Sequence, residues 1–249
     1  MLVALVSASA LAACGEKTIQ NITGVVPTAS VKFFNFGVNA PQVNFYADTI
    51  KLTAISSTDT VESTTGVKYG GASSGGYYSG LEAGQYTLSG KIASTTDKGL
   101  AVANVPAQID AGKKYSFYMS GIYDANGKTV DAFVVEDPVP DAFDYTSANV
   151  RFVNAISNAA PMTLYAKNDS SLVEVAIGST VAYKAAGAFT AVPQGAYDLS
   201  TRYAGSGTNV ITRAAVSFLA GHYYTITAYG DITAASGTNK PALDNTANR

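Results

Sequence analysis

Alternation of apolar and polar residues is the main pattern in this chain, and it occurs twice. An Ala-Gly turn followed by an alternating segment is found at residues 111–121 and again at residues 220–230. The apolar positions of the alternation are Tyr115, Phe117 and Met119 in the first copy and Tyr224, Ile226 and Ala228 in the second. Alternate side chains of a strand lie on one face, so we expect these residues to point into a core. The pattern therefore predicts a tandem repeat of a β domain.

Three further segments are repeated in the same order. They are residues 29–35 and 148–154, residues 39–47 and 158–166, and residues 84–88 and 195–199. The second pair places a polar turn with Pro before a strand, and the third has the form Gly-x-Tyr-x-Leu. This order predicts an all-β fold of two tandem antiparallel β-sandwiches, with about seven strands each and little helix.

The composition of the segments between the repeats suggests domain boundaries. The segment after the first copy is acidic and contains Pro, and the C-terminal segment is polar. We expect a signal peptide at residues 1–13, a tether at 14–28, β-sandwich domains at 29–136 and 148–235, a linker at 137–147 and a flexible tail at 236–249.

Overall composition supports two ordinary cores and narrows the range of partners. The chain has 249 residues, of which 47% are hydrophobic and 14% are charged, which is not the composition of a disordered protein. The formal net charge is −2, and the sequence contains no cluster of Lys and Arg residues. Because binding to nucleic acids depends on neutralising phosphates, we expect no nucleic-acid partner.

The only cysteine, Cys14, follows an apolar run at residues 1–13 that is too short to span a bilayer. The sequence Leu11-Ala12-Ala13-Cys14-Gly15 resembles a bacterial lipobox. That resemblance implies a diacylglyceryl group on the Cys14 thiol and cleavage before it. The membrane would then be a partner through the lipid, and Gly15 is compatible with an outer-membrane lipoprotein facing the periplasm or the medium.

An alternative for this region is a buried N-terminal strand that ends in a free cysteine. No Lys or Arg precedes the apolar run, whereas signal peptides usually begin with basic residues. A true start upstream of Met1 would explain why no basic residue precedes the apolar run.

The repeated motifs together, from the Pro turn to the Ala-Gly-x-x-Tyr-Ser/Thr strand, resemble the bacterial domain of unknown function 4397. The likeness covers residues 29–136 and 148–230. It implies a secreted or lipid-anchored sandwich of immunoglobulin-like or prealbumin-like type, often in tandem. It brings no catalytic residues with it.

One motif suggests an enzyme. Residues 71–75 (GASSG) fit the Gly-x-Ser-x-Gly pattern of a hydrolase nucleophile elbow. That elbow needs a strand before it and a helix after it, and no long helical pattern occurs. The single histidine, His222, occupies the position of Lys113 in the first copy, which favours a solvent-facing residue. We therefore expect no enzyme, with a cryptic hydrolase as the remaining alternative.

Two groups of oxygen ligands raise the possibility of a structural calcium ion, the only cofactor considered. Residues 124–131 faintly resemble a calcium loop, but Asn126-Gly127 favours a two-residue type I′ hairpin turn. The second group consists of the interdomain acids Glu136, Asp137, Asp141 and Asp144. These acids either clamp calcium between the domains or are solvated linker charges.

Tyrosines suggest the remaining functional hypothesis. Tyr69, Tyr77 and Tyr78, beside a Gly-rich stretch, are candidates for an exposed patch that stacks on sugar rings. Tyr115 and Tyr224 are candidates for tethering a loop through the hydroxyl, as in a tyrosine corner. We expect a non-enzymatic envelope module that binds a polysaccharide or an envelope protein, and the alternative is a spacer without a ligand. A binder should gather the three loop tyrosines on one accessible face.

Overall fold

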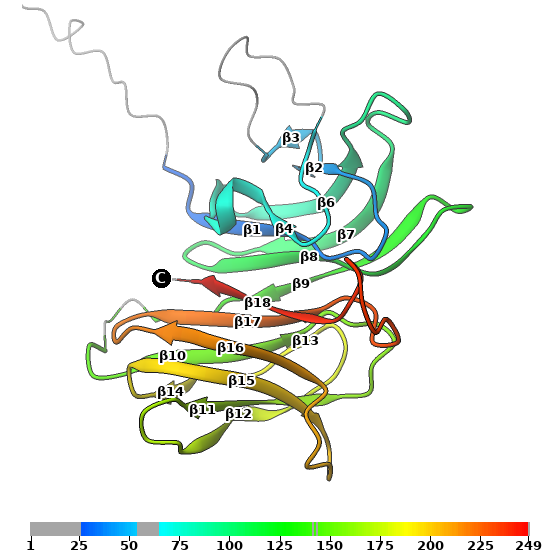
Figure 1. Ribbon diagram of the computed structural model, residues 1–249. Helices are drawn as coiled ribbons and strands as arrows, with labels where there is room; N and C mark the ends of the chain where they lie inside the picture. The colour runs from blue at the N-terminus through cyan, green and yellow to red at the C-terminus, as the bar shows by residue number, and fades with distance from the viewer. Residues whose placement is uncertain (1–25, 54–64, 141, 143, 249) are drawn as a thin grey trace, which may run out of the picture.

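The described part of the chain forms four β-sheets stacked in layers (Figure 1). The computed structural model describes residues 26–53, 65–140, 142 and 144–248, so Cys14 and Asp141 lie outside the described residues. Within these ranges, no helix has the length and apolar character needed to cross a membrane.

The first repeat supplies two of the sheets. Its strands are β1 (Ala29–Asn35), β2 (Val43–Ala47), β3 (Ile50–Lys51), β4 (Gly71–Ala72), β5 (Ser79–Leu81), β6 (Gly84–Ile92), β7 (Ala101–Ile109), β8 (Lys114–Asp124) and β9 (Thr129–Glu136), with a 3₁₀ turn η2 (Ser73–Gly76) after β4. The outer sheet has the order β3-β2-β6-β7, and the inner sheet has the order β4-β1-β8-β9 with β5 also paired to β1. Strands β1 and β8 run parallel, while the other paired strands of this repeat are antiparallel in the described ranges.

The second repeat has the same topology, element by element. Its strands are β10 (Ala148–Asn154), β11 (Met162–Asn168), β12 (Glu174–Val181), β13 (Ala185–Ala186), β14 (Thr190–Val192), β15 (Gly195–Tyr203), β16 (Ile211–Phe218), β17 (Tyr223–Tyr229) and β18 (Ala242–Ala247). The outer sheet is β12-β11-β15-β16 and the inner sheet is β13-β10-β17-β18. Tyr115 lies opposite Val31 in the parallel pair β1–β8, and Tyr224 lies opposite Val150 in the parallel pair β10–β17. The predicted duplication and the all-β fold of two sandwiches are confirmed.

Each repeat has more strands than the expected seven, because the described residues form nine in each copy. The additional strands are short segments such as β3, β4 and β13, which have two residues each. Such segments carry too few residues for an alternating pattern to be recognised.

The cores lie between the outer and inner sheet of each repeat. Tyr115, Phe117 and Met119 belong to the first core, as predicted. The equivalent residues Tyr224, Ile226 and Ala228 belong to the second.

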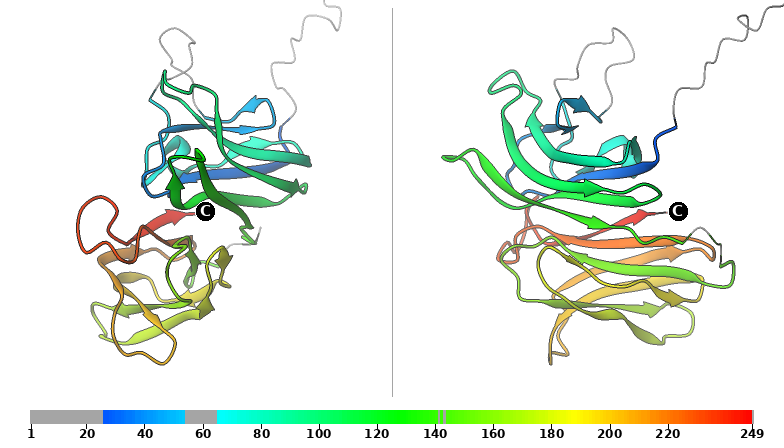
Figure 2. Two further views of the ribbon diagram at one scale, coloured as in Figure 1. Left: turned by 90° about the vertical axis from the view of Figure 1, so that its right-hand side faces the viewer. Right: turned by 180° about the vertical axis from the view of Figure 1, so that it is seen from behind.

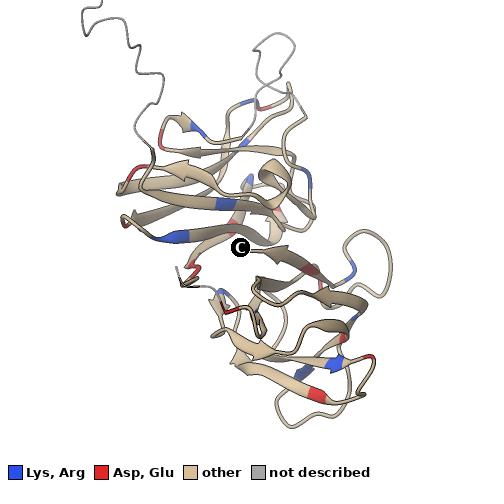
Figure 3. Ribbon diagram, turned by 90° about the vertical axis from the view of Figure 1, so that its left-hand side faces the viewer, with Lys and Arg blue, Asp and Glu red and all other residues tan. Residues whose placement is uncertain are grey.

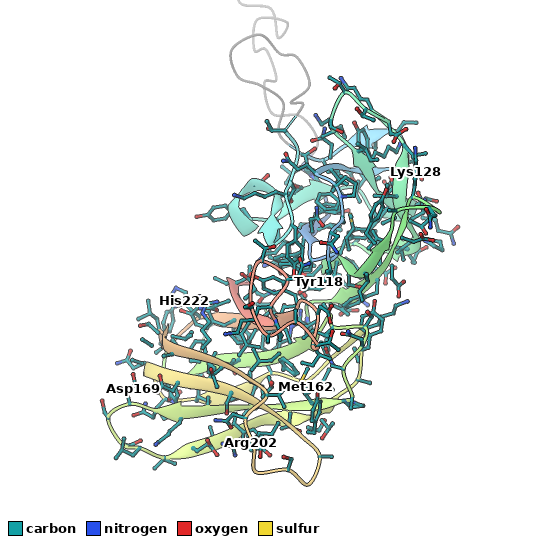
Figure 4. All side chains as sticks on the ribbon, turned by 45° about the vertical axis from the view of Figure 1, so that its right-hand side comes forward. Tyr118, Lys128, Met162, Asp169, Arg202 and His222 are labelled. Carbon is teal, nitrogen blue, oxygen red and sulfur yellow. The ribbon has the colours of Figure 1, made fainter. Side chains whose placement is uncertain are left out.

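The opposite faces of the two inner sheets are also buried, because these sheets pack against each other (Figures 1 and 2). A third apolar cluster fills this contact, and its buried members are Phe34, Phe36, Tyr118, Phe133, Val153 and Ala155. Tyr118 lies between the repeats in Figure 4, and the ring of Phe36 stacks on Tyr229 with centroids 4.4 Å apart. The repeats therefore form one four-layer stack rather than two separate beads.

The predicted flexible tail at residues 236–249 is wrong, since it contains strand β18. This strand pairs with β17 from Ala242 to Ala247, and Leu243 is buried in the second core. Strand β18 is the counterpart of β9. Its sequence, ALDNTA, has weak β-propensity, so tertiary packing determines this strand.

The predicted hairpin between β8 and β9 is confirmed, but the predicted two-residue turn is wrong. Asp124 pairs with Thr129, which leaves residues 125–128 as a four-residue turn with Lys128 at a φ of 50°. The Asp124 carboxylate accepts a hydrogen bond from the Asn126 backbone N–H at 2.9 Å. This local bond favours the longer turn and uses one of the supposed calcium ligands.

The predicted tyrosine tethers are present in both copies. The Tyr115 hydroxyl accepts a hydrogen bond from the Asp110 backbone N–H at 3.2 Å. The Tyr224 hydroxyl accepts one from the Leu219 N–H, also at 3.2 Å. In each copy the donor lies five residues before the tyrosine, so the bond closes the turn that precedes the strand.

Each hydroxyl accepts one backbone hydrogen bond at an equivalent turn. Tyr115→Phe and Tyr224→Phe should therefore each lower the free energy of unfolding by about 1 kcal/mol. Their effects should add in the double variant, because the sites are far apart. Urea denaturation measures both quantities, and Tyr123→Phe is the matched control. A large loss in one variant with none in the other would show that the two turns are not equivalent.

Candidate functional site

A cluster of polar and charged side chains lies inside the contact between the two inner sheets. We call it the polar cluster, and its members are Lys32, Tyr78, Ser116, Asp137, Arg151, Thr225 and Asn248. All except the half-buried Tyr78 are at most 4% exposed. Burial of such groups is costly unless each has a partner, so their contacts indicate what the cluster does.

Arg151, on β10, forms an ion pair with Asp137, the residue after β9. The two side chains are 1% and 0% exposed. The guanidinium also donates from Nη1 to the Glu136 carbonyl at 2.8 Å and from Nε to the Thr225 hydroxyl at 2.9 Å. The Arg151 side chain of the second repeat is thus bound to the end of the first repeat.

The Asp137 carboxylate has further partners within the first repeat. Its Oδ2 accepts hydrogen bonds from the hydroxyls of Ser116 and Tyr78, both at 2.7 Å. Burial, followed by the nearby negative charge of Asp137, raises the pKa of Tyr78, so the phenol remains a donor at physiological pH. Asn248 then donates from Nδ2 to the Tyr78 oxygen at 2.9 Å.

Lys32, on β1, is the second buried cation of the cluster. Its ammonium donates to the Ala247 carbonyl of β18 and lies 4.3 Å from the centre of the Tyr78 ring. Burial lowers the pKa of Lys32 to about 8, although the Asp137 carboxylate partly opposes this shift.

The polar cluster has approximate twofold symmetry, because equivalent positions of the repeats meet in it. The equivalent pairs are Lys32 and Arg151, Ser116 and Thr225, Asp137 and Asn248, and Tyr78 and Phe189. The backbone N–H of Asp137 donates to the Lys114 carbonyl, and that of Asn248 donates to the Tyr223 carbonyl, both at 2.7 Å. Each basic residue thus reaches a carbonyl at the end of the last strand of the other repeat.

The interdomain acids that the structure describes, Glu136, Asp137 and Asp144, are engaged separately and do not converge on a calcium site. Asp137 is buried in its ion pair, so it is neither a solvated linker charge nor available to calcium. Glu136 binds the Lys113 ammonium at 2.9 Å on the surface. Hydrogen bonds from Thr146 and Ser147 hold the pKa of Asp144 below its usual value. In the described ranges, no three His, Cys, Asp or Glu side chains are placed to hold a metal ion, and Asp141 lies outside those ranges.

The three loop tyrosines do not gather on one accessible face. Tyr77 is 77% exposed, whereas Tyr78 turns into the polar cluster. Tyr69 packs with its ring edge against Tyr229, with centroids 5.9 Å apart, and burial raises the pKa of Tyr69 to about 12. The expected aromatic patch is therefore wrong for Tyr78, whose role lies inside the contact.

The hydrolase motif lacks the local structure that a nucleophile elbow requires. A strand of only two residues, β4, precedes Ser73, and Ser73 itself begins the four-residue 3₁₀ turn η2. His222 is half-buried rather than solvent-facing. Its ring stacks on Tyr224 with centroids 6.0 Å apart, and its Nδ1 lies 3.1 Å from the Ala220 carbonyl of its own turn.

Sequence reasoning aligned Lys32 with Arg151 but did not assign them a role. Each is a charged residue between apolar neighbours, in SVKFF and NVRFV. A charge at the same place in two otherwise apolar strands is a signal of a paired, buried group, since an unpaired one would be too costly there. Asp137 gave no such signal, because its neighbours are acidic residues and prolines.

Replacing Arg151 should be strongly destabilising. Arg151→Met leaves the Asp137 charge buried without its main partner, which costs about 3–5 kcal/mol of unfolding free energy. The double variant Arg151→Met/Asp137→Leu should recover part of that loss. Chemical denaturation measures both effects. The control is Arg202→Met, which breaks a more exposed pair with Glu174 and should therefore cost much less unfolding free energy. Equal losses in Arg151→Met and Arg202→Met would contradict this role.

Lys32 should make stability depend on pH between about 8 and 10.5. In this window the unfolded chain holds a proton that the folded chain has released, so the contribution of Lys32 to stability rises with pH. The Lys32→Met variant has no ammonium group at this position, so it lacks this pH dependence. The measurement is the difference in unfolding free energy between wild type and Lys32→Met at pH 7.5 and at pH 10. Wild type should gain relative to the variant, and a constant difference would refute the prediction.

Comparison with protein families identifies the family to which this chain belongs. The model of the domain of unknown function DUF4397 matches residues 29–165 and 148–248, which correspond to the two repeats with an overlap at the start of the second. No curated protein matches the chain. Together the two matches cover most of the described fold, so the chain belongs to the DUF4397 family and carries two copies of its domain in tandem.

Proposed function

We propose that the protein is a non-enzymatic, lipid-anchored protein of the bacterial cell envelope, whose two repeats act as one rigid body that presents a binding surface to a polysaccharide. The observation that carries this proposal is the buried contact between the inner sheets. Domains joined by a linker usually move relative to each other unless their interface is extensive and apolar. Here the interface contains an apolar cluster and the Arg151–Asp137 ion pair.

Contacts around the edge of the interface support the same conclusion. Asp131 of the first repeat accepts a hydrogen bond from the Tyr183 hydroxyl at 2.9 Å and pairs with the Lys184 ammonium at 2.7 Å. At another point, the Asn239 amide donates to the Asn39 side chain at 2.9 Å. Opening the repeats would break these bonds as well as expose the buried cluster.

The position of the chain's entry into the fold suggests how the body is oriented on the membrane. The described chain enters at β1, in the first repeat, and the outer sheet of the second repeat lies at the far side of the stack (Figure 1). A lipid on Cys14 would therefore lie next to the first repeat. The tether at residues 14–28 would reach at most about 50 Å if fully extended.

The distribution of charge argues against a nucleic acid as the partner. Lys and Arg are interspersed with Asp and Glu over both repeats, without a continuous basic stripe on the ribbon (Figure 3). The two most buried cations, Lys32 and Arg151, are engaged inside the contact.

A spacer without a ligand is the second candidate, and the separation of Tyr69, Tyr77 and Tyr78 favours it. In that case the stack would only hold its outer surfaces away from the membrane. Binding to a polysaccharide separates these two candidates, since a spacer should bind none.

Labelling with radioactive palmitate in a bacterial host tests the anchor. Wild type should incorporate the label and sediment with membranes, because the Cys14 thiol would carry the acyl chains. Cys14→Ser should lose both properties. The control is Cys14→Ser/Thr18→Cys, which restores a thiol outside the lipobox and should remain unlabelled. Unlabelled wild type, or a labelled Cys14→Ser variant, would remove the anchor from the proposal.

A further inference from the structure

The two repeats differ in the connection between the last two strands of the inner sheet. In the first repeat, residues 125–128 join β8 to β9, whereas in the second repeat residues 230–241 join β17 to β18. We call this longer segment the β17–β18 loop. Loops of this length in compact domains are often functional.

Several bonds hold the β17–β18 loop in a defined conformation. The Asp231 carboxylate accepts hydrogen bonds from the Asn158 amide at 2.7 Å and from the Thr233 backbone N–H at 2.9 Å. The Asp231 N–H donates to the Asn239 carbonyl at 2.9 Å, which closes the base of the loop. The loop is also bonded to Asn39 of the first repeat. It therefore offers a preformed surface rather than one that must be ordered on binding.

Together with β16, the β17–β18 loop encloses a cleft of about 490 Å³. We call it the β16–β18 cleft, and its lining residues with polar or charged side chains are Thr212, Arg213, Tyr229, Thr238 and Lys240. The lining contains two cations and no carboxylate. Arg213 is fixed in place because its Nη1 donates to the Leu243 carbonyl at 2.7 Å, across the mouth of the sandwich. The remaining N–H groups of the Arg213 guanidinium take no part in the bond to Leu243.

The same edge of the first repeat provides an internal comparison. There, a cleft of about 440 Å³ lies between β7 and β9. Val105 occupies the position equivalent to Arg213, since each lies opposite the Leu of the Gly-x-Tyr-x-Leu strand. The lining of this first cleft contains the Glu136 carboxylate and no cation. Apart from Val105 and Ala132, which are equivalent to Arg213 and Leu243, the two linings come from different positions of the repeat, and of these two clefts only the β16–β18 cleft contains cations.

Arg213 also borders a hollow of about 390 Å³ on the outer sheet of the second repeat. That hollow is lined by the carboxylates of Glu174 and Asp198 as well as by cations. The two carboxylates of that hollow offset its two cations, so the β16–β18 cleft is the more favourable place for an anion.

We propose that the β16–β18 cleft binds carboxylate-bearing sugar units, so that the ligand of this protein is an acidic polysaccharide. This inference rests on the proposed function and specifies its ligand class and site. The Arg213 guanidinium binds a uronate carboxylate, Lys240 supplies the second positive charge, and the hydroxyls of Thr212 and Thr238 bind sugar hydroxyl groups. The cleft between β7 and β9 of the first repeat, whose lining contains Glu136 and no cation, does not bind this ligand.

Calorimetric titration of the full chain in a neutral detergent tests the proposal, with oligogalacturonate as the acidic probe and a glucose oligosaccharide of equal length as the neutral one. Oligogalacturonate should bind, and its affinity should fall as salt is added. Lys240→Gln and Arg213→Gln should each weaken binding about tenfold or more, as expected when an ion pair worth about 1.4 kcal/mol is lost. Lys240 is exposed, so Lys240→Gln is the variant that should leave folding intact.

The control is Lys113→Gln, which removes an exposed lysine from the first repeat and should leave the affinity unchanged. Binding of oligogalacturonate that is equal in wild type, Lys240→Gln and Arg213→Gln would overturn the assigned site. Binding of the neutral oligosaccharide alone would overturn the acidic ligand and leave the proposed function standing. Absence of binding to either probe would overturn both and favour the spacer.

Discussion

The Arg151–Asp137 ion pair is the interaction on which the arrangement of this molecule depends. Two opposite charges without access to water must face each other, and an error in their placement is costly. Arg151 lies on the first strand of the second repeat, and Asp137 directly follows the last strand of the first. The pair therefore determines how one inner sheet lies on the other. Net stability comes mainly from the apolar cluster around Tyr118, while the charges select one orientation of the sheets.

Approximate twofold symmetry explains how the two repeats meet, and a difference at one pair of equivalent positions explains why their contact is not fully symmetric. The repeats meet through equivalent positions, as two copies of one chain do in a twofold dimer. Lys32 and Arg151 both bind a carbonyl of the opposite repeat, but only the first repeat ends in a carboxylate, because Asn248 occupies the position of Asp137. One carboxylate thus serves two cations. Covalent linkage of the repeats makes such specialisation possible, and the β17–β18 loop is a second instance of it.

Much of the fold could be predicted from the sequence, and the failures share one physical cause. Alternation located Tyr115 and Tyr224 correctly, because each lies on a strand whose core face is strictly apolar. Strand β18 and the burial of Asp137 were missed, because β18 depends on pairing with β17 across a long loop and Asp137 depends on its ion pair with Arg151 of the other repeat. Local patterns report what a segment prefers alone, whereas polar residues such as Asp137 are buried here by partners distant in sequence. The cleft was missed for the same reason, since Arg213 and Lys240 come together only in the folded chain.

The central claim is that both repeats form one rigid body, and a distance measurement across the stack tests it most directly. Spin labels on cysteines introduced at Thr87 and Lys167, in a Cys14→Ser background, would place one probe on an exposed residue of each outer sheet. Pulsed electron paramagnetic resonance then gives the distribution of distances between them. A single narrow distribution is predicted. A broad distribution, as expected for two domains that move freely on a linker, would contradict it.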